Sequence, residues 1–246
     1  MDKRTAVVTG GIGGLGTAIC IALARAGRRV IAADLDGDAA RIDAFKRQVD
    51  GLDVRFAALD VTGFEACGAF MQALEAAGEG PDILVNAAGI TRDATLRKMD
   101  RAQWDAVLSV NLDSVFNLCR HAVEGMVARG FGRIVNISSV NGQTGQFGQT
   151  NYSAAKAGMH GFTMALAREV ARKGVTVNSI SPGYCETAMV MAIPDGIRQD
   201  IIDRVPVGRL GHPDEIARTA AFLSADEAGY ITGANIPVNG GLYMGF

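Results

Sequence analysis

Three side chains that can act together in proton transfer lie in the stretch SSVNGQTGQFGQTNYSAAK, residues 138–156. If Tyr152 and Lys156 share a helix, their spacing places both side chains on the same face. A lysine ammonium beside a phenol favours the phenolate, so we expect Lys156 to lower the pKa of Tyr152 from its usual value of about 10. The hydroxyl of Ser139 can hold a carbonyl oxygen. Hydride addition to a ketone creates an alkoxide, and this set would supply the proton and the donor which that reaction requires.

Each of these residues also has an ordinary structural interpretation. A tyrosine and a lysine at helical spacing often only pack together and contact solvent. Asn111, in the segment SVNLDSVF, can hold a water beside Lys156 for proton supply, or it can be a core amide that distorts its helix. The chemical interpretation is favoured because these residues follow a glycine-rich loop and Asp34 in the sequence.

The glycine-rich loop is the segment TGGIGGLG, residues 9–16, which fits both TGxxxGxG and GxGxxG. It follows a strand-like run and opens a helix-like one, the context in which such loops bind the pyrophosphate of a dinucleotide. Glycines let the backbone approach the phosphates, and amides at the helix N-terminus meet their charge. A tight turn that binds nothing is the alternative. The expected contacts are Gly10, Gly11, Ile12, Gly13, Gly14, Leu15 and Gly16.

Asp34 ends the second strand-like run, 18 residues after Gly16. Its carboxylate can accept hydrogen bonds from the hydroxyls of the adenine-linked ribose, whereas a 2′-phosphate there would meet a like charge. We therefore expect NADH to be favoured, with NADPH still possible. Asp36 and Asp38 add negative charge just beyond. The alternative is that Asp34 only caps a helix.

Further cofactor contacts are expected where later strands end, because parallel sheets bind ligands at their carboxyl edge. Asp60 and Val61 can bind the adenine. Asn86 can face the cofactor or tie neighbouring strands together, and we favour the second role. Thr187 can bond the nicotinamide carboxamide or cap a helix. The remaining expected contacts are Ala87, Ala88, Gly89, Pro182 and Gly183, with Tyr152 and Lys156 themselves.

Short β-rich runs alternate with helical segments along most of the chain. The runs are RTAVVT, RRVIAA, VRFAAL, DILVNAA, RIVNIS, VTVNSI and NIPV, with segments such as TAICIALARAG and DEIARTAAFLS between them. This alternation predicts an α/β fold, a single doubly wound Rossmann-type domain over residues 1–246 with a seven-stranded parallel sheet and helices on both faces. Residues 182–210 are less regular and are expected to cover the site. The helices after Trp104 and Tyr152 are apolar on more than one side, which fits an oligomer interface or burial within one subunit.

The composition argues against several classes of protein. Hydrophobic residues make up 48% and charged residues 20%, as in globular proteins. The net charge of −2 gives no general attraction to nucleic acid or to membrane surfaces. Irregularly spaced cysteines and isolated histidines predict no disulfide and no metal site. With no secretion signal or apolar span evident, we expect a cytoplasmic protein.

The segments TGGIGGLG, NAAG, SSVNG, YSAAK and SPGYCET, with Asn111, resemble the short-chain dehydrogenase/reductase family over essentially the whole chain. Within it, ITRDATLRKM and GRIVNISSVNGQTGQFGQTNYSAAKAGMHGFTMALA are similar to bacterial acetoacetyl-CoA reductases of polyhydroxybutyrate synthesis. The resemblance implies a homotetramer that reduces acetoacetyl-CoA to (3R)-3-hydroxybutanoyl-CoA. It implies a catalytic set of Asn111, Ser139, Tyr152 and Lys156. Such reductases commonly use NADPH, and on this point we give priority to Asp34.

The resemblance also directs attention to two loops around the expected site. Gln146, Phe147, Gln149 and Tyr184 are expected to join Ser139 and Tyr152 in binding the acyl group, because amides can bond a thioester oxygen and rings can pack on a short chain. Glutamines in a glycine-rich loop can equally be exposed spacers. Arg92, Arg97 and Lys98 can bind the phosphates of coenzyme A or form surface salt bridges.

Two other functions remain open from the sequence. A 3-oxoacyl-(acyl-carrier-protein) reductase shares the same chemical core and needs a basic surface for an acidic carrier, which Arg129, Arg133, Arg172 and Lys173 can supply. A dinucleotide-binding module without catalysis is the third possibility. Such a module would not need the serine, tyrosine and lysine set, and all three residues are present.

Overall fold

The computed structural model describes residues 3–245, in which strands and helices alternate as the sequence predicts. The strands are β1 (Thr5–Thr9), β2 (Arg29–Asp34), β3 (Val54–Ala58), β4 (Ile83–Asn86), β5 (Gly132–Ile137), β6 (Val175–Pro182) and β7 (Asn235–Val238). The helices are α1 (Gly14–Arg25), α2 (Ala39–Gln48), α3 (Phe64–Ala76), α4 (Arg101–Leu108), α5 (Ser114–Arg129), α6 (Asn141–Thr144), α7 (Thr150–Val170), α8 (Ala188–Met191), α9 (Asp195–Arg204) and α10 (Pro213–Leu223). A π-helical turn joins α4 to α5 over Ser109–Asp113.

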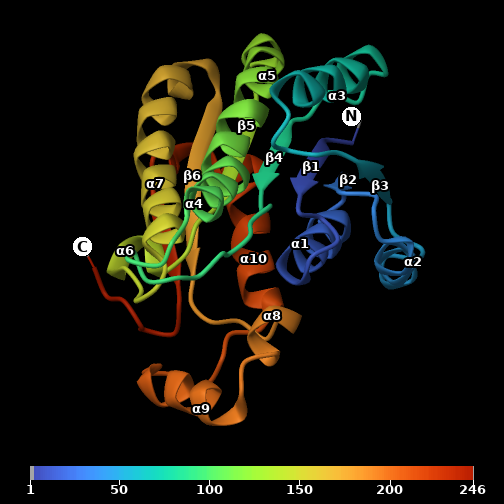
Figure 1. The fold of residues 1–246 in the computed structure, drawn as a ribbon. Coiled ribbons are helices and arrows are strands. Elements are labelled where there is room, and N and C mark those ends of the chain that lie inside the picture. The colour runs from blue at the N-terminus through green and yellow to red at the C-terminus, as the bar shows by residue number, and fades with distance from the viewer. Residues whose placement is uncertain (1–2, 246) are drawn as a thin grey trace.

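The seven strands form one parallel sheet in the order β3-β2-β1-β4-β5-β6-β7 (Figure 1). This confirms the predicted doubly wound fold. The strand order changes direction between β1 and β4, so the loops that follow these two strands diverge at the carboxyl edge. In doubly wound sheets the ligand binds at this switch point.

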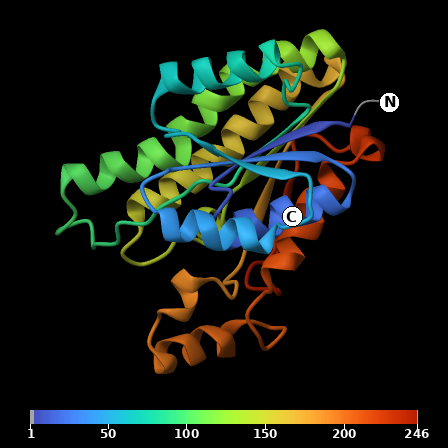
Figure 2. The same cartoon turned by 90° about the vertical axis from the view of Figure 1, so that its right-hand side faces the viewer.

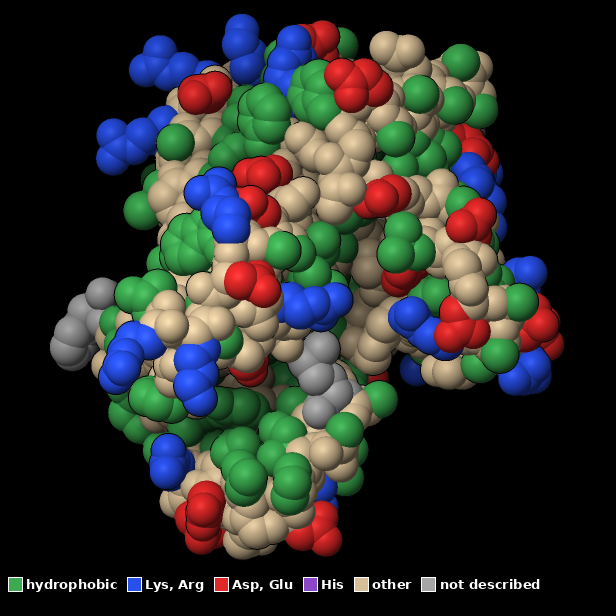
Figure 3. Space-filling view, viewed as in Figure 1, with side chains coloured by type: hydrophobic (Ala, Val, Ile, Leu, Met, Phe, Trp, Pro, Cys, Tyr) green, Lys and Arg blue, Asp and Glu red, His purple; other side chains and the backbone are tan. Residues whose placement is uncertain are grey.

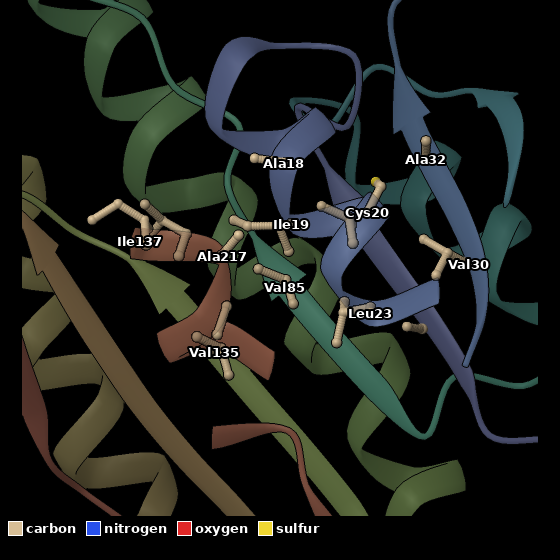
Figure 4. Close-up of a cluster of buried hydrophobic side chains, with 14 of the residues drawn as sticks. Ala18, Ile19, Cys20, Leu23, Val30, Ala32, Val85, Val135, Ile137 and Ala217 are labelled. Carbon is tan, nitrogen blue, oxygen red and sulfur yellow. The ribbon is translucent and has the colours of Figure 1, made fainter. Parts of the chain in front are cut away.

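Helices cover both faces of the sheet. One buried cluster joins α1, α2 and α10 to the sheet, and a second joins α3, α5 and α7 to the opposite face. In Figure 4, Ile19 and Leu23 of α1 lie with Val85 and Val135 of the sheet and Ala217 of α10. Because both faces are buried, the central strands are apolar without alternation; every residue of β1 is buried.

A row of polar residues crosses the sheet near its carboxyl edge. Thr9, Asn86, Asn136, Ser179 and Asn235 lie opposite one another on successive strands. The Asn86 amide donates to Asn136 Oδ1 at 2.8 Å, and the Ser179 hydroxyl donates to Asn235 Oδ1 at 2.9 Å. These two bonds link β4 to β5 and β6 to β7 through buried side chains.

The irregular segment after β6 forms a separate lobe beyond the carboxyl edge. It carries α8 and α9, which lie apart from the two helical layers in both ribbon views (Figures 1 and 2). Hydrophobic side chains gather on this lobe (Figure 3), and Met191, Ile197 and Val207 are exposed there. Within residues 3–245, no helix is both long and apolar enough to cross a bilayer.

Candidate active site

The glycine-rich loop is shaped by close contacts that only glycine allows. Gly10 has a φ of 62°, and a Cβ there would lie 2.8 Å from the carbonyl oxygen of Ala87. A Cβ at Gly16 would overlap the carbonyl oxygen of Gly10. Helix α1 begins at Gly14 with no acidic residue in its first turn. Since the first amides of a helix have no partner within the helix, this N-terminus can receive an anion at the carboxyl edge.

Asp34 lies directly beside this loop and holds part of it. Its Oδ2 accepts a hydrogen bond from the amide of Ile12 at 3.2 Å, and its Oδ1 accepts from the amide of Leu35 at 2.9 Å. The carboxylate is half-buried at the end of β2. The expected alternative of a helix cap applies instead to Asp38, which accepts from the amide of Arg41 at the start of α2.

The residues that end β4 hold the switch point together. The Thr9 hydroxyl accepts hydrogen bonds from the amides of Ala87 and Ala88 at 3.2 and 3.3 Å. Asn86 is buried, and its amide bonds Asn136 on β5. This geometry agrees with the strand-tying role that we favoured for Asn86. The Thr9 contact could have been suspected from its place at the head of the glycine loop.

The other expected cofactor residues lie after β3 and at the end of β6. Asp60 is exposed and accepts from the amide and hydroxyl of Thr62, while Val61 beside it is buried. Pro182 ends β6 and accepts from the amide of Val140 at 2.8 Å; the next residue, Gly183, donates to Val238. Thr187 stands at the start of α8 without a side-chain cap bond. A Cβ built at Gly14 would lie 3.1 Å from the methyl group of Thr187. Thr187 therefore lies against the N-terminus of α1.

The tyrosine and lysine lie on α7 as the spacing predicts. Lys156 is 3% exposed and donates from Nζ to the carbonyl oxygen of Ile137 at 2.8 Å. Its Nζ lies 5.6 Å from the centre of the Tyr152 ring. Ser139 follows β5 and accepts at Oγ from the backbone amide of Asn141 at 3.1 Å. The three side chains therefore meet where β5 ends and α7 begins.

Burial sets the pKa values of this pair, in a way that differs from the expected acidified phenol. Removal from solvent is the main reason that the pKa of Tyr152 is raised, to about 12. A hydrogen bond with Ser139 lowers this pKa, and the charges of Asp93 and Tyr184 raise it. Burial lowers the pKa of Lys156 to about 7. The lysine charge that should favour the phenolate is thus itself disfavoured, because an apolar surrounding penalises both charged forms. In the ligand-free protein the phenol stays protonated.

Asn111 lies in the π-helical turn and is fully buried. Its amide nitrogen donates to the carbonyl oxygens of Ile90 and Val107, both at 2.9 Å. Its Oδ1 has no hydrogen-bond partner among the described residues. A Cβ built at Gly89 would lie 2.7 Å from this oxygen and 3.6 Å from Lys156 Nζ, so the two groups converge there. Asn111 therefore distorts its helix and also presents a free acceptor beside Lys156.

The loop residues expected to bind the acyl group differ in their exposure and in the hydrogen bonds that they already make. Gln146 is exposed and Phe147 is 87% exposed, so both can meet a ligand. Tyr184 lies close enough to Tyr152 for its charge to affect that phenol. Gln149 differs from the expectation, because both ends of its amide already bond protein side chains, Asp93 and Asn141. Sequence reasoning missed these two partners.

The two groups of basic residues lie at opposite edges of the sheet. Arg92, Arg97 and Lys98 are exposed in the loop that follows β4 at the carboxyl edge, and no salt bridge involves them in the described chain. Arg129 and Arg133 flank the start of β5, at the amino edge. Arg129 pairs with Glu75 at 2.8 Å, and Arg133 is 4% exposed. These two arginines therefore cannot form a free basic surface at the site.

Comparison with known proteins places this chain in a family. A family model described as Enoyl-(Acyl carrier protein) reductase matches residues 10–243. An acetoacetyl-CoA reductase of Allochromatium vinosum is 57% identical, over 98% of this chain and 99% of that one. A 3-oxoacyl-(acyl-carrier-protein) reductase of Pseudomonas aeruginosa is 42% identical, over 99% of each chain. A crystal structure from Agrobacterium tumefaciens, provisionally assigned as a gluconate dehydrogenase, matches with a TM-score of 0.92 at 36% identity, over 97% of this chain and 95% of that one.

The chain belongs to the short-chain dehydrogenase/reductase family and is an oxidoreductase that uses a nicotinamide dinucleotide. The residues at the switch point fit that cofactor. The glycine cradle leaves no room for side chains where the backbone must approach a pyrophosphate, and the N-terminus of α1 supplies amides for its charge. Asp34 stands where the sheet edge meets this loop.

Proposed function

We propose that the protein reduces the 3-keto group of acetoacetyl-CoA to (3R)-3-hydroxybutanoyl-CoA, with NADH as the favoured cofactor. The observation that carries this proposal is the meeting of Ser139, Tyr152 and Lys156 at the carboxyl edge, beside a glycine loop shaped for a pyrophosphate. The 57% identity to an acetoacetyl-CoA reductase supports the choice of substrate.

In this proposal each side chain has one task at the ketone. Reduced nicotinamide, when bound, supplies the hydride. The Ser139 hydroxyl donates a hydrogen bond to the ketone oxygen, and Tyr152 gives that oxygen its proton. Lys156 is held by the Ile137 carbonyl with its ammonium toward the phenol, where its charge stabilises the phenolate as the proton leaves. The unpartnered Oδ1 of Asn111 would hold the water that restores the proton.

Around the site, exposed groups are suited to the rest of the substrate. We assign Gln146, Phe147 and Tyr184 to the acyl chain and its thioester. The unpaired cations Arg92, Arg97 and Lys98 are suited to the phosphates of coenzyme A, since phosphate oxygens form strong hydrogen bonds with such groups. The cofactor contacts proposed are those of the glycine loop, Asp34 and the strand ends, including Asp60, Val61, Gly89 and Thr187.

A 3-oxoacyl-(acyl-carrier-protein) reductase is the second candidate, favoured by the 42% identity to such an enzyme over the whole chain. A carrier protein needs a basic docking surface near the site. The residues first considered for it do not serve well: Arg133 is buried, Arg129 is ion-paired, and Arg172 and Lys173 precede β6 at the amino edge. Of the basic residues considered from the sequence, Arg92, Arg97 and Lys98 lie at the carboxyl edge.

We further propose a homotetramer. An apolar groove lined by Phe64, Leu112, Phe116 and Phe162 runs along the outer side of α5 and α7, and Phe116 is exposed. Exposed apolar patches of this kind mark contact surfaces. Light scattering in solution measures the number of subunits directly, and a monomer or a dimer would refute this part of the proposal.

The test of function is steady-state reduction of acetoacetyl-CoA and of carrier-bound acetoacetate, with NADH and NADPH in turn. Acetoacetyl-CoA with NADH is expected to give the highest kcat/KM. Tyr152→Phe is expected to lower turnover by roughly 10²- to 10⁴-fold, while NADH binding, followed by fluorescence, persists. A preference for the carrier substrate would favour the second candidate, and unchanged turnover in Tyr152→Phe would remove the tyrosine from its role.

A further inference from the structure

A continuous series of hydrogen bonds connects a surface carboxylate to the serine of the site. Asp93 Oδ2 accepts from Gln149 Nε2 at 2.8 Å. Gln149 Oε1 in turn accepts from Asn141 Nδ2 at 2.9 Å. The backbone amide of Asn141 donates to Ser139 Oγ at 3.1 Å. We call Asp93, Gln149 and Asn141 the amide relay.

The carboxylate fixes the order of donors and acceptors in the amide relay. An ionised carboxylate can only accept, so Gln149 must turn its NH₂ group toward Asp93 and its carbonyl oxygen toward Asn141. Asn141 is then held as a donor through its side chain, and its backbone amide remains aimed at Ser139. Because Ser139 Oγ accepts that amide, its own hydroxyl hydrogen is directed outward as a donor, toward Tyr152 in the ligand-free protein. A ketone oxygen requires a donor of this kind.

The side chain of Asp93 is not required to hold its own loop in place. The carbonyl oxygen of Arg92 accepts from Asn151 Nδ2 at 3.1 Å, and the amide of Ala94 donates to the carbonyl oxygen of Gly148 at 2.9 Å. Both neighbours of Asp93 are thus tied by backbone atoms to the segment that begins α7. The contact of Asp93 with Gln149 is a separate link, and its effect passes to Asn141.

The Asn141–Gln149 bond adds to the backbone bonds at the start of α6, where the amide of Val140 donates to Pro182 and that of Gly142 donates to Ser139. Asn141 opens this four-residue helix, and its side chain is 9% exposed. A Cβ built at Gly142 would lie 2.8 Å from the carbonyl carbon of Lys156, so α6 packs directly on α7. A shift of Asn141 would therefore move the amide that holds Ser139, next to the residues that hold the lysine.

We propose that Asp93 is a positioning residue which, through Gln149 and Asn141, holds the Ser139 hydroxyl in the orientation that donates to the substrate oxygen. This inference rests on the proposed function, since ketone reduction gives Ser139 its role. It also gives Gln149 a role in positioning in place of a direct bond to substrate.

The test uses Asp93→Ala, which removes the acceptor, and Asp93→Asn, which keeps an amide oxygen. Asp53→Ala is the matched control, because Asp53 is also an exposed carboxylate with a single side-chain partner, Lys3, and lies before β3 at the amino edge. Losing one complete donor to the reacting oxygen costs about 10²- to 10³-fold in kcat. A misdirected donor should cost less, and we expect roughly a tenfold lower kcat for Asp93→Ala, little change for Asp53→Ala, and an intermediate loss for Asp93→Asn.

A double-mutant cycle separates positioning from general damage. If Asp93 acts through Ser139, Asp93→Ala should lower kcat by less than about twofold in a Ser139→Ala background, because coupled residues are not additive. A full tenfold loss in both backgrounds would overturn the inference. The same holds if Asp93→Ala leaves kcat unchanged in the otherwise wild-type protein.

A measurement without substrate keeps the inference separate from the proposed function. Hydrogen exchange of the Asn141 backbone amide, followed by NMR in the ligand-free protein, should be severalfold faster in Asp93→Ala and unchanged in Asp53→Ala. Unchanged exchange in Asp93→Ala would refute the amide relay whatever the substrate is. Faster exchange in a protein that does not reduce acetoacetyl-CoA would uphold the relay and reject the proposed substrate.

Discussion

Replacement of Asp34 by asparagine is the sharpest test of the proposed cofactor preference. The carboxylate accepts from the amides of Ile12 and Leu35, at 3.2 and 2.9 Å, so it supports the glycine loop in addition to its proposed role at the ribose. Asparagine keeps the shape and one acceptor but removes the charge. Any loosening of the loop affects NADH and NADPH alike, and the ratio of their kcat/KM values cancels this shared effect.

The expected change in that ratio has two parts. A hydrogen bond from a ribose hydroxyl to a charged acceptor contributes about 1.5–3 kcal/mol. Repulsion between a carboxylate and a 2′-phosphate near 4 Å amounts to about 1 kcal/mol in water and about 4 kcal/mol at an effective dielectric constant of 20. Asp34 is half-buried, so we take the lower part of this range. Since asparagine keeps a neutral acceptor that contributes about 0.5–1.5 kcal/mol, the net loss for NADH is about 1–1.5 kcal/mol. With about 1–2 kcal/mol of relieved repulsion, the sum of about 2–3.5 kcal/mol shifts the NADH to NADPH ratio by roughly 30- to 300-fold, at about 1.4 kcal/mol for each factor of ten.

The assay is reduction of saturating acetoacetyl-CoA at varied NADH and varied NADPH, for the wild type and for Asp34→Asn. Asp36→Asn is the control, because Asp36 is an exposed carboxylate two positions along the chain. That control should change the ratio by less than about threefold, since an exposed charge is well screened. Equal losses with both cofactors in Asp34→Asn would show that the carboxylate serves only the glycine loop, and the argument for NADH would be wrong.

Three further predictions follow from single contacts. Gly16→Ala should weaken NADH binding at least tenfold in a fluorescence titration, because a Cβ there overlaps the Gly10 carbonyl oxygen; equal affinity would contradict the cradle. With a pKa of about 7, Lys156 loses its charge as pH rises, so kcat/KM for the ketone should fall above about pH 7; Lys156→Arg, which stays charged, should lack this fall. Arg133→Met should lower the free energy of unfolding in urea by about 3 kcal/mol, because the guanidinium donates to four backbone carbonyls; an unchanged midpoint would contradict this.

The sheet was predictable because its signal is local. The strands contain short runs of β-branched and other apolar residues, such as AVV in β1 and ILV in β4, and these runs can be recognised without their neighbours. The fourth run was predicted as residues 82–88, whereas β4 ends at Asn86. Ala87 and Ala88 leave the sheet because their amides bond the Thr9 hydroxyl at the switch point. That contact joins two strands far apart in sequence, and apolar periodicity cannot indicate it.

The residues of the site were predictable from local patterns and from the family resemblance, whereas the contacts between distant segments were not. The glycine loop and the Tyr152–Lys156 spacing are local patterns, and the structure places both at the carboxyl edge. Asp93 contacts Gln149 across 56 positions, and nothing in its own segment distinguishes it from a surface carboxylate. A distortion of the helix at Asn111 was one of the two sequence interpretations, but the local pattern does not indicate a π-helical turn or an unpartnered Oδ1.

The expected acidity of Tyr152 shows how burial can outweigh a neighbouring charge, and the outcome bears on the direction of reaction. A phenol with a pKa of about 12 is still a far stronger acid than an alcohol, so proton transfer to a developing alkoxide remains favourable. Alcohol oxidation would instead need the phenolate as base, and burial disfavours that form in the ligand-free protein. The charge of Lys156 opposes this effect of burial, and because the pKa of Lys156 is itself about 7, its help to the phenol weakens as pH rises.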